Sequence, residues 1–173
     1  MSITTKRGDD GTTDLLFGGK AGKGDAQIEA LGAVDELNAT LGLARVAMDG
    51  EGAESIDQIQ KWLVTLMGEL AMPPGKDAEY DRAGFGRIAA EEIGWMESLS
   101  EGIEGDRKFK GWLRPGAAGG ELAARLHLAR TVARRAERRA WEVNECVCSD
   151  EVRIFLNRLS DVLWLMARKS EES

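Results

Sequence analysis

The chain has 173 residues, of which 43% are hydrophobic and 31% charged, and its formal net charge is −7 at pH 7. This length fits one domain with its own core, and the acidic balance argues against nucleic acid or an anionic membrane as the main partner, since either would favour an extended basic surface. No run approaches the roughly 18 apolar residues of a membrane-spanning helix, and the N-terminus lacks the apolar region of a secretion signal. We therefore expect a cytoplasmic protein with no membrane span.

Residues 1–24 are rich in glycine and show no helical period, so we expect an extended, looping segment. Leu15, Leu16 and Phe17 interrupt its polar run and need a surface to pack on, which predicts an ordered loop laid against the body of the protein. The glycines allow positive φ and close backbone approach, so successive N–H groups could converge on an anion. The run Gly18–Gly24 is not a Walker A loop, because that motif needs four residues between its glycines and Ser or Thr after the Lys.

Apolar residues at helical spacing predict five helices, with no convincing strand and no internal repeat. Asp25 is the expected N-cap of the first helix, Ser55-Ile-Asp-Gln58 resembles a capping box before the second, and Ser149 or Asp150 is expected to cap the last. The expected helices cover about residues 26–48, 55–71, 88–99, 121–146 and 150–169, with loops over 75–86 and 102–110. This pattern indicates one all-α domain over residues 1–173, in which the loop segment 1–24 precedes a helical bundle over 25–173.

Residues 121–146 concentrate arginine on one helix, above a seam of small alanines. Arg130, Arg134, Glu137 and Arg138 share one face. Like charges at i,i+4 repel by a few tenths of a kcal/mol, so an anion is expected beside them. Two interpretations stay open at this point: a solvated face with Glu137 as partial counter-ion, or an anion site in which guanidinium groups supply fixed donors to phosphate or carboxylate.

Two glycines, Gly32 and Gly42, fall inside the first expected helix. Each costs about 1 kcal/mol against alanine, so we expect close approach by a neighbouring helix or a ligand at that surface. Asp35 lies three residues after Gly32, and a carboxylate on a close-packed face requires a cationic partner. An arginine of residues 121–146 is the expected partner.

The sequence offers few other groups for catalysis. His127 is the only histidine, and Ala124 stands where a carboxylate-bridged di-metal site would need the Glu of its Glu-x-x-His pair, so that site is excluded. His127 could be structural or could hydrogen-bond a ligand. Cys146 and Cys148 lack redox or zinc spacing, and we interpret both as ordinary thiols in a reducing compartment.

Three ordered motifs at the two ends of the chain carry a family resemblance. They are Arg130-Thr-Val-Ala-Arg134-Arg135-Ala-Glu137-Arg138; Phe155-Leu-Asn157-Arg158-Leu-Ser-Asp161; and Thr5-Lys6-Arg7-Gly8-Asp9-Asp10-Gly11-Thr12-Thr13 followed by Gly18-Gly19, Lys23 and Val34-Asp35-Glu36-Leu37-Asn38. This set resembles the PduO-type ATP:cob(I)alamin adenosyltransferases. Residues 50–110 match only in helical pattern. The resemblance implies a five-helix bundle of the adenosyltransferase type with an ordered glycine-rich N-terminal loop.

Enzymes of that family transfer the 5′-deoxyadenosyl group of ATP to Co(I) of a reduced corrinoid, forming adenosylcobalamin and triphosphate. The resemblance therefore implies a transferase with ATP as co-substrate, cob(I)alamin as substrate, and Mg²⁺ held mainly through the ATP phosphates rather than by an assigned protein ligand. Because the nucleophile belongs to the corrinoid, the protein mainly positions the reactants and stabilises charge. The resemblance also implies a homotrimer with active sites between subunits, and an adenosylcobalamin-dependent enzyme as a possible receiver of the product.

The resemblance assigns roles to individual residues at both ends of the chain. The loop from Thr5 to Gly11, together with Lys23, would cradle the phosphates and Mg²⁺, while Arg134 would grip the triphosphate and Asn157 would orient the nucleotide. The implied ATP-binding residues are Thr5, Lys6, Gly8, Asp9, Gly11, Thr13, Lys23, Arg134, Glu137 and Asn157. The implied catalytic residues are Arg134, Arg130, Asp35 and Asn157.

Three further expectations follow from the same resemblance. Arg130 would pair with Asp35, within one subunit or across a subunit boundary. Glu137 would hold either Arg135 or the metal-bound phosphates, and both options stay open. Trp112 would lie under the corrin ring, where it would exclude a lower axial ligand and make Co(II) easier to reduce.

The chain departs from the family pattern at two places. Gln27 stands where the family usually has Arg, and the turn after Pro115 carries about two more residues than usual. These departures leave an alternative function, a catalytically weak paralogue that binds ATP or adenosylcobalamin as a carrier or sensor. A purely structural bundle would leave the arginine face and the glycine loop unexplained.

Overall fold

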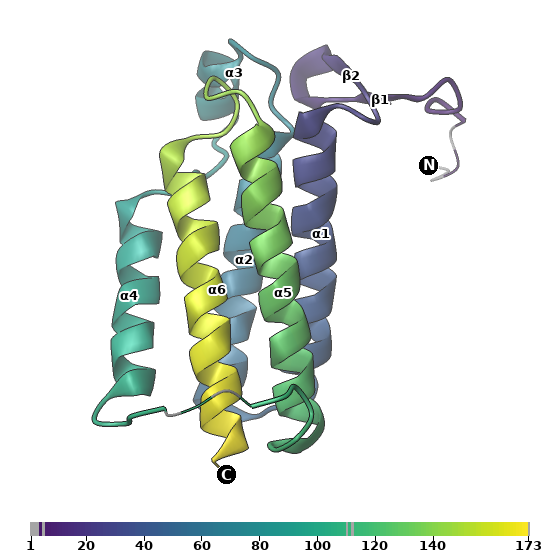
Figure 1. Ribbon diagram of the computed structural model, residues 1–173. Helices are drawn as coiled ribbons and strands as arrows, with labels where there is room; N and C mark the ends of the chain where they lie inside the picture. Colours follow the sequence, from purple (N-terminus) through teal and green to yellow (C-terminus); the bar gives the residue numbers. More distant parts are fainter. Residues whose placement is uncertain (1–3, 5, 110, 112, 173) are drawn as a thin grey trace.

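Figure 1 shows the computed structural model of the chain, which describes residue 4, residues 6–109, residue 111 and residues 113–172. This part of the chain contains six α-helices, one 3-10 turn and one two-stranded hairpin. In chain order the elements are β1 (Thr12–Asp14), η1 (Leu16–Gly18), β2 (Lys20–Gly22), α1 (Ala26–Arg45), α2 (Gly50–Leu70), α3 (Asp77–Arg82), α4 (Ala90–Glu104), α5 (Gly120–Glu142) and α6 (Asp150–Glu171). The predicted all-α bundle is confirmed.

The body of the molecule is a bundle of α1, α2, α5 and α6, with α4 packed along α6 (Figure 1). Its core is built from one apolar stripe of each helix, and leucines such as Leu37, Leu63, Leu126 and Leu159 have no exposed surface. Each such side chain contributes about 1.5–3 kcal/mol on burial. The predicted alanine seam of α5 is buried throughout, at Ala129, Ala133, Ala136 and Ala140. These small side chains let α1 and α6 approach α5 closely, and the exposed surface of α5 includes Arg134 and Arg138.

Helix ends differ from prediction where local signals compete. α2 begins at Gly50, before the expected capping box, and Ser55 Oγ donates to the Glu51 carbonyl at 2.8 Å from inside the helix. Ser149 does cap α6, because its side chain accepts the Val152 N–H at 3.3 Å. Within the described ranges, no helix combines the length and apolarity needed to cross a bilayer.

Secondary structure lies in two segments that were predicted to be loops. The six-residue helix α3 interrupts the expected loop 75–86, and β1 and β2 form an antiparallel hairpin inside residues 1–24. The hairpin pairs Thr12 with Gly22, Thr13 with Ala21 and Asp14 with Lys20. Strands of three residues are too short to show a period, which is why the sequence pattern missed them.

The expected ordering of the N-terminal segment agrees with the structure. Leu16 donates its backbone N–H to the Ala71 carbonyl at 3.0 Å, and the Phe17 ring contacts Tyr80 and Phe85. Asp25 is the N-cap residue of α1, but its carboxylate accepts the Gly22 N–H at 2.8 Å instead of an N–H of the helix. The hairpin is therefore attached to the ends of both α1 and α2.

Candidate functional site

The N-terminal segment encloses a hollow of about 570 Å³ with charges of both signs. Hydrogen bonds from the Thr12 hydroxyl and N–H hold the pKa of Asp10 below its usual value, so this carboxylate is ionised. Lys6 has φ of 59°, a left-handed conformation that side chains other than glycine rarely adopt. The lining residues are Lys6, Arg7, Asp9, Asp10, Asp14 and Lys20. Of these, Lys6 and Asp9 were predicted site residues, whereas Arg7, Asp10, Asp14 and Lys20 were not.

Lys23 closes the loop that begins at Gly8. Its Nζ donates to the Gly8 carbonyl at 2.6 Å, and its backbone N–H donates to the Gly11 carbonyl at 2.9 Å. A Cβ atom at Gly8 would lie 2.9 Å from that Nζ, so a side chain there would displace the ammonium group. An ammonium has three donors, and the single bond to Gly8 leaves Lys23 two for a phosphate.

The arginine face of α5 is only partly neutralised. Arg134 and Arg138 are exposed, and neither forms an ion pair with another described residue. Arg130 is half-buried, and its Nε has no hydrogen-bond partner. Arg135 pairs with Glu36 of α1 instead of Glu137. Glu137 therefore does not hold Arg135 within the chain, which was one of its two expected roles.

Glu137 and Asn157 are in contact across the α5–α6 interface. Asn157 Nδ2 donates to Glu137 Oε1 at 3.0 Å, and Asn157 Oδ1 accepts from Arg158 at 3.0 Å. Arg158 in turn donates through Nε to Glu97 of α4 at 2.9 Å. This chain of bonds fixes the orientation of the Asn157 amide. Two predicted site residues are thereby placed together, within one helical turn of Arg134.

A second hollow, of about 250 Å³, lies between α5, α6 and the segment before α5. Trp112 and Thr5, both predicted site residues, lie outside the described residues, but the chain neighbours of Trp112 line this hollow. The lining residues are Gly111, Leu113, Pro115, His127, Arg130, Trp164 and Arg168. Its apolar wall is therefore contributed partly by the segment in which the family resemblance places the corrinoid, and its cationic side chains come from α5 and α6.

His127 contacts α6, and Cys148 is buried in the core. His127 Nε2 lies 3.0 Å from Glu171 Oε1, and Arg168 donates to the other Glu171 oxygen at 2.9 Å. These contacts hold α5 against the last turn of α6.

Both cysteines are free, and burial raises the pKa of the Cys148 thiol to about 11, so it stays protonated at neutral pH.

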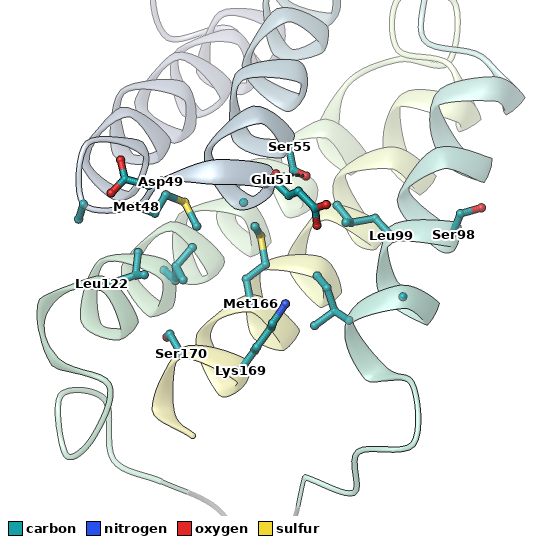
Figure 2. Close-up of a pocket in the computed structure, with 15 residues that line it drawn as sticks. Met48, Asp49, Glu51, Ser55, Ser98, Leu99, Leu122, Met166, Lys169 and Ser170 are labelled. Atoms are coloured by element: carbon teal, nitrogen blue, oxygen red, sulfur yellow. Dashed lines mark hydrogen bonds between the residues drawn. The ribbon is translucent and has the colours of Figure 1, made fainter. Parts of the chain in front are cut away.

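A larger hollow, of about 600 Å³, contains none of the predicted site residues. It lies between α2, α4, α5 and α6, and Figure 2 shows Met48 and Met166 among the side chains that line it. Asp49, Glu51 and Lys169 contribute charges of both signs to its lining.

The two groups of predicted ligand-binding residues are not brought together within one chain. Figure 1 shows the described chain before β1 extending away from the bundle beyond α1, whereas Arg130, Arg134 and Arg138 belong to α5. Among the described residues, no hydrogen bond or ion pair joins residues 6–23 to α5. Asp35 is exposed and forms no ion pair with Arg130 in the same chain.

Two sequence interpretations of α1 change in the light of the structure. Nothing from a neighbouring helix lies within 4 Å of a Cβ built on Gly32, so the expected close approach inside the chain is wrong at this position. Gln27, the departure from the family pattern, donates its side-chain amide to the carbonyls of Leu70 at 2.7 Å and Met72 at 2.9 Å. Gln27 therefore satisfies carbonyls at the end of α2 that the helix itself leaves free.

A family model described as cobalamin adenosyltransferase matches residues 3–170. This chain belongs to the cobalamin adenosyltransferase family. Among curated relatives, the corrinoid adenosyltransferase PduO of Salmonella typhimurium is 37% identical over 174 residues, which cover 99% of this chain and 50% of the relative. The cobalamin adenosyltransferase of Cupriavidus metallidurans is 35% identical over 173 residues, covering 96% of this chain and 86% of the relative. The chain thus spans about half the length of the Salmonella protein.

Solved structures of this adenosyltransferase family share the fold. A variant of the PduO-type ATP:corrinoid adenosyltransferase from Lactobacillus reuteri, complexed with cobalamin and ATP, matches with a TM-score of 0.83 and 30% identity, covering 99% of this chain and 91% of that chain. A second variant from the same organism, complexed with ATP, matches with a TM-score of 0.84 and 29% identity over 98% of this chain and 94% of that chain.

Proposed function

We propose that this chain transfers the 5′-deoxyadenosyl group of ATP to Co(I) of a reduced corrinoid, forming adenosylcobalamin and triphosphate. The family match over residues 3–170 and the likeness to structures complexed with cobalamin and ATP support this proposal. The observation that carries it is the exposed Arg134, which has no ion-pair partner among the described residues and lies beside the Glu137–Asn157 contact. A fixed guanidinium with free donors suits a phosphate ligand.

In this reaction the Co(I) electron pair attacks C5′ of the ribose, a cobalt–carbon bond forms, and the C5′–O bond breaks. The triphosphate leaves with the electrons of that bond, so negative charge grows on the oxygen that departs. Arg134 would stabilise that charge from the rigid α5, because preorganised donors need no reorganisation as charge develops. Asn157, held by Glu137, would keep the nucleotide oriented for in-line attack.

The N-terminal hollow is the proposed site of the ATP phosphates. Lys6, which lines the hollow, and Lys23, which bonds the Gly8 carbonyl of the same loop, are proposed to bind phosphate. We add Arg7 and Lys20 because they line the same hollow. The described residues contain no group of three or more His, Cys, Asp or Glu that could hold a metal. Mg²⁺ is proposed to enter bound to phosphate oxygens, since Mg²⁺ usually keeps several waters and takes few protein ligands. Bound in that way, Mg²⁺ would neutralise charge on the triphosphate.

The proposed active site is shared between adjacent copies in a homotrimer. The separation of residues 6–23 from α5 within one chain supports this arrangement, because neither group alone would surround a nucleotide. In such an assembly the free carboxylate of Asp35 could meet Arg130 of a neighbouring copy. The product would pass from this cytoplasmic enzyme to an adenosylcobalamin-dependent enzyme.

The corrinoid is proposed to bind at the hollow lined by Leu113, Pro115 and Trp164. Aromatic and apolar side chains there match the flat apolar face of a corrin ring. Trp112 would cover the lower face of cobalt, so that no axial ligand binds there and reduction to Co(I) becomes easier.

The second candidate is a weak paralogue that binds ATP or adenosylcobalamin without rapid turnover. Its main support was Gln27, but the bonds of Gln27 to α2 give that residue a structural role. The two functions are separated by mixing the purified protein with ATP, Mg²⁺ and chemically reduced cobalamin and recording visible spectra. An enzyme accumulates adenosylcobalamin beyond the amount of protein, whereas a weak paralogue forms no more than about one equivalent over the same time and mainly shifts the spectrum of the bound corrinoid.

A further inference from the structure

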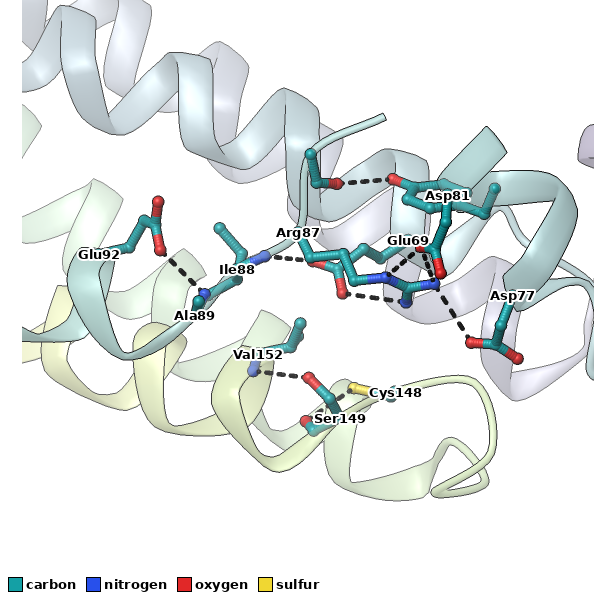
Figure 3. Close-up of polar contacts among 12 residues, drawn as sticks. Glu69, Asp77, Asp81, Arg87, Ile88, Ala89, Glu92, Cys148, Ser149 and Val152 are labelled. Atoms are coloured by element: carbon teal, nitrogen blue, oxygen red, sulfur yellow. Dashed lines mark hydrogen bonds and ion pairs between the residues drawn. The ribbon is translucent and has the colours of Figure 1, made fainter. Parts of the chain in front are cut away.

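Glu69 is a buried acid that the proposed chemistry does not use. It lies in the last turn of α2, and only 5% of its side chain is exposed. Its Oε1 accepts the backbone N–H of Ile88 at 2.7 Å (Figure 3). Burying a carboxyl group is unfavourable unless its oxygens are satisfied, so this contact fixes the segment that joins α3 to α4 against the end of α2.

Arg87, the residue before Ile88, extends the same contact to α3. Its NH1 lies 4.0 Å from Glu69 Oε2, and its NH2 lies 3.2 Å from Asp77 Oδ1 and 3.1 Å from Asp81 Oδ1 (Figure 3). The guanidinium also stacks 4.8 Å from the centre of the Tyr80 ring. Glu69 therefore holds the end of this segment at Arg87 and Ile88, and Arg87 in turn holds α3, a six-residue helix too short to be stable alone.

Tyr80 connects this segment to the N-terminal hairpin. Its side chain is 1% exposed, and its hydroxyl donates to the Gly86 carbonyl at 3.1 Å. The Phe17 ring, between β1 and β2, lies 6.4 Å from the Tyr80 ring and 6.3 Å from the Phe85 ring, measured between centroids. Phe17 has φ of 55°, a conformation that costs a non-glycine residue about 1–2 kcal/mol. The two rings thus hold Phe17 in a backbone conformation that it would otherwise leave.

The hairpin also touches the residues that follow α2. Leu16 bonds the Ala71 carbonyl, and a Cβ atom on Gly19 would lie only 2.5 Å from Pro73 Cγ. The surface under the hairpin therefore consists of residues 71–73 together with Tyr80 and Phe85. The position of Tyr80 and Phe85 in this surface depends on Glu69.

We propose that Glu69 is a positioning residue for the nucleotide: by holding Arg87 and Ile88, it fixes the Tyr80 and Phe85 surface on which the hairpin with Lys20 rests. The nucleotide part of this inference rests on the proposed function. Glu69 touches no phosphate itself, and it acts through the order of the hairpin and of the hollow that the hairpin encloses. Loss of its contacts should weaken ATP binding while leaving the rate at saturating ATP nearly unchanged.

The contact between Glu69 and Ile88 survives protonation. Burial raises the pKa of the Glu69 carboxyl to about 7, against the opposing effects of the Ile88 N–H and Arg87, and the charges of Glu151 and Glu92 raise it further. A neutral carboxyl still accepts the Ile88 N–H through its carbonyl oxygen. Glutamine has the same acceptor and nearly the same shape, so Glu69→Gln should preserve the position of the hairpin.

The test compares Glu69→Leu with Glu69→Gln in the full chain. Glu79→Gln is the matched control, since Glu79 lies on α3 but pairs with Lys76, away from Arg87. Hydrogen exchange of residues 12–22 is measured without nucleotide, and the affinity for MgATP is measured by calorimetry. Glu69→Leu should speed exchange and weaken MgATP binding roughly tenfold each, the change expected when a buried hydrogen bond of about 1.4 kcal/mol is lost. Glu69→Gln and Glu79→Gln should each stay within about twofold of the wild type.

Normal exchange and normal affinity in a folded Glu69→Leu variant would overturn the proposal. If Glu69→Leu does not fold, Phe17→Ala cuts the connection at the exposed hairpin end while Glu69 stays intact, and it must produce the same two changes. Unchanged exchange and affinity in Phe17→Ala would also overturn it. If the wild type fails to bind MgATP, the proposed function fails, whereas the exchange measurement still decides whether Glu69 orders the hairpin.

Discussion

The side-chain amide of Asn157 on α6 donates to the carboxylate of Glu137 on α5 at 3.0 Å. The amide oxygen is occupied as well, because it accepts from Arg158. Asn157 is therefore held in one orientation before any ligand arrives. A preoriented amide loses little freedom on binding, so the contact should serve nucleotide binding more than stability.

The losses in kcat/KM for ATP caused by removing the Glu137 and Asn157 side chains should not add. Either Glu137→Ala or Asn157→Ala is expected to raise KM for ATP about tenfold, because each removes one hydrogen bond and disorders its partner. The double variant should be little worse than either single variant, with a coupling of about 1 kcal/mol in kcat/KM for ATP. Additive losses in that double-mutant cycle would mean that the two side chains act independently.

Arg134 should be the most costly single arginine to remove. Arg134→Ala is expected to lose about 2–4 kcal/mol of transition-state stabilisation, or roughly 30- to 1000-fold in kcat/KM, because the charge on the leaving triphosphate goes uncompensated. Lys6→Ala should cost less, since a lysine on a glycine loop is less preorganised. Arg138→Ala is the matched control, one turn further along the same exposed face. Equal small effects of Arg134→Ala and Arg138→Ala would favour a merely solvated arginine face.

A site shared between copies predicts complementation. The Arg134→Ala variant and a Lys6→Ala, Lys23→Ala variant should each be impaired alone. In mixed trimers made by co-expression, a site is intact when it takes α5 from the Lys6→Ala, Lys23→Ala variant and the N-terminal segment from the Arg134→Ala variant. Random assembly makes about a quarter of all sites intact in this way. Activity of the mixture should therefore exceed that of both parents. Activity no higher than their average would argue for sites contained within single chains.

The stability of the protein should depend on pH through Glu69. Its pKa of about 7 in the folded chain exceeds the ordinary value of 4.5, so the folded state binds the proton more tightly. The contribution of Glu69 is fully present below about pH 4.5 and is lost as the pH rises through about 7. Chemical unfolding at fixed protein concentration should show the wild type losing about 2–3 kcal/mol relative to Glu69→Gln between pH 5 and pH 8. Parallel pH curves for the two proteins would contradict this assignment.

The long helices could be predicted because their own periodicity encodes them. α1, α5 and α6 bury regular stripes of apolar or small residues, and the face shared by Arg130, Arg134 and Glu137 follows directly from helical geometry. The Glu137–Asn157 contact depends on how α5 packs against α6. Here the motifs suggested the site residues, and only the structure placed them together.

The missed features depend on contacts distant in the sequence. α3 has no period of its own, and the contacts of Arg87 with Asp77, Asp81 and Glu69 hold it in place. Lys20 joins the N-terminal hollow because β2 pairs with β1, which the sequence pattern did not predict. The alternation of side chains along a short hairpin could have drawn attention to Lys20 if the hairpin had been recognised.

The most direct measurement of the central claim is the stoichiometry of the reaction. Wild-type protein is supplied with MgATP and chemically reduced cob(I)alamin under anaerobic conditions, and both products are quantified by chromatography. The account predicts one triphosphate for each adenosylcobalamin formed, over many turnovers, and a rate at least about 30-fold lower for Arg134→Ala. Formation of ADP or pyrophosphate in place of triphosphate, or ATP binding with no cobalt–carbon bond formed, would contradict it.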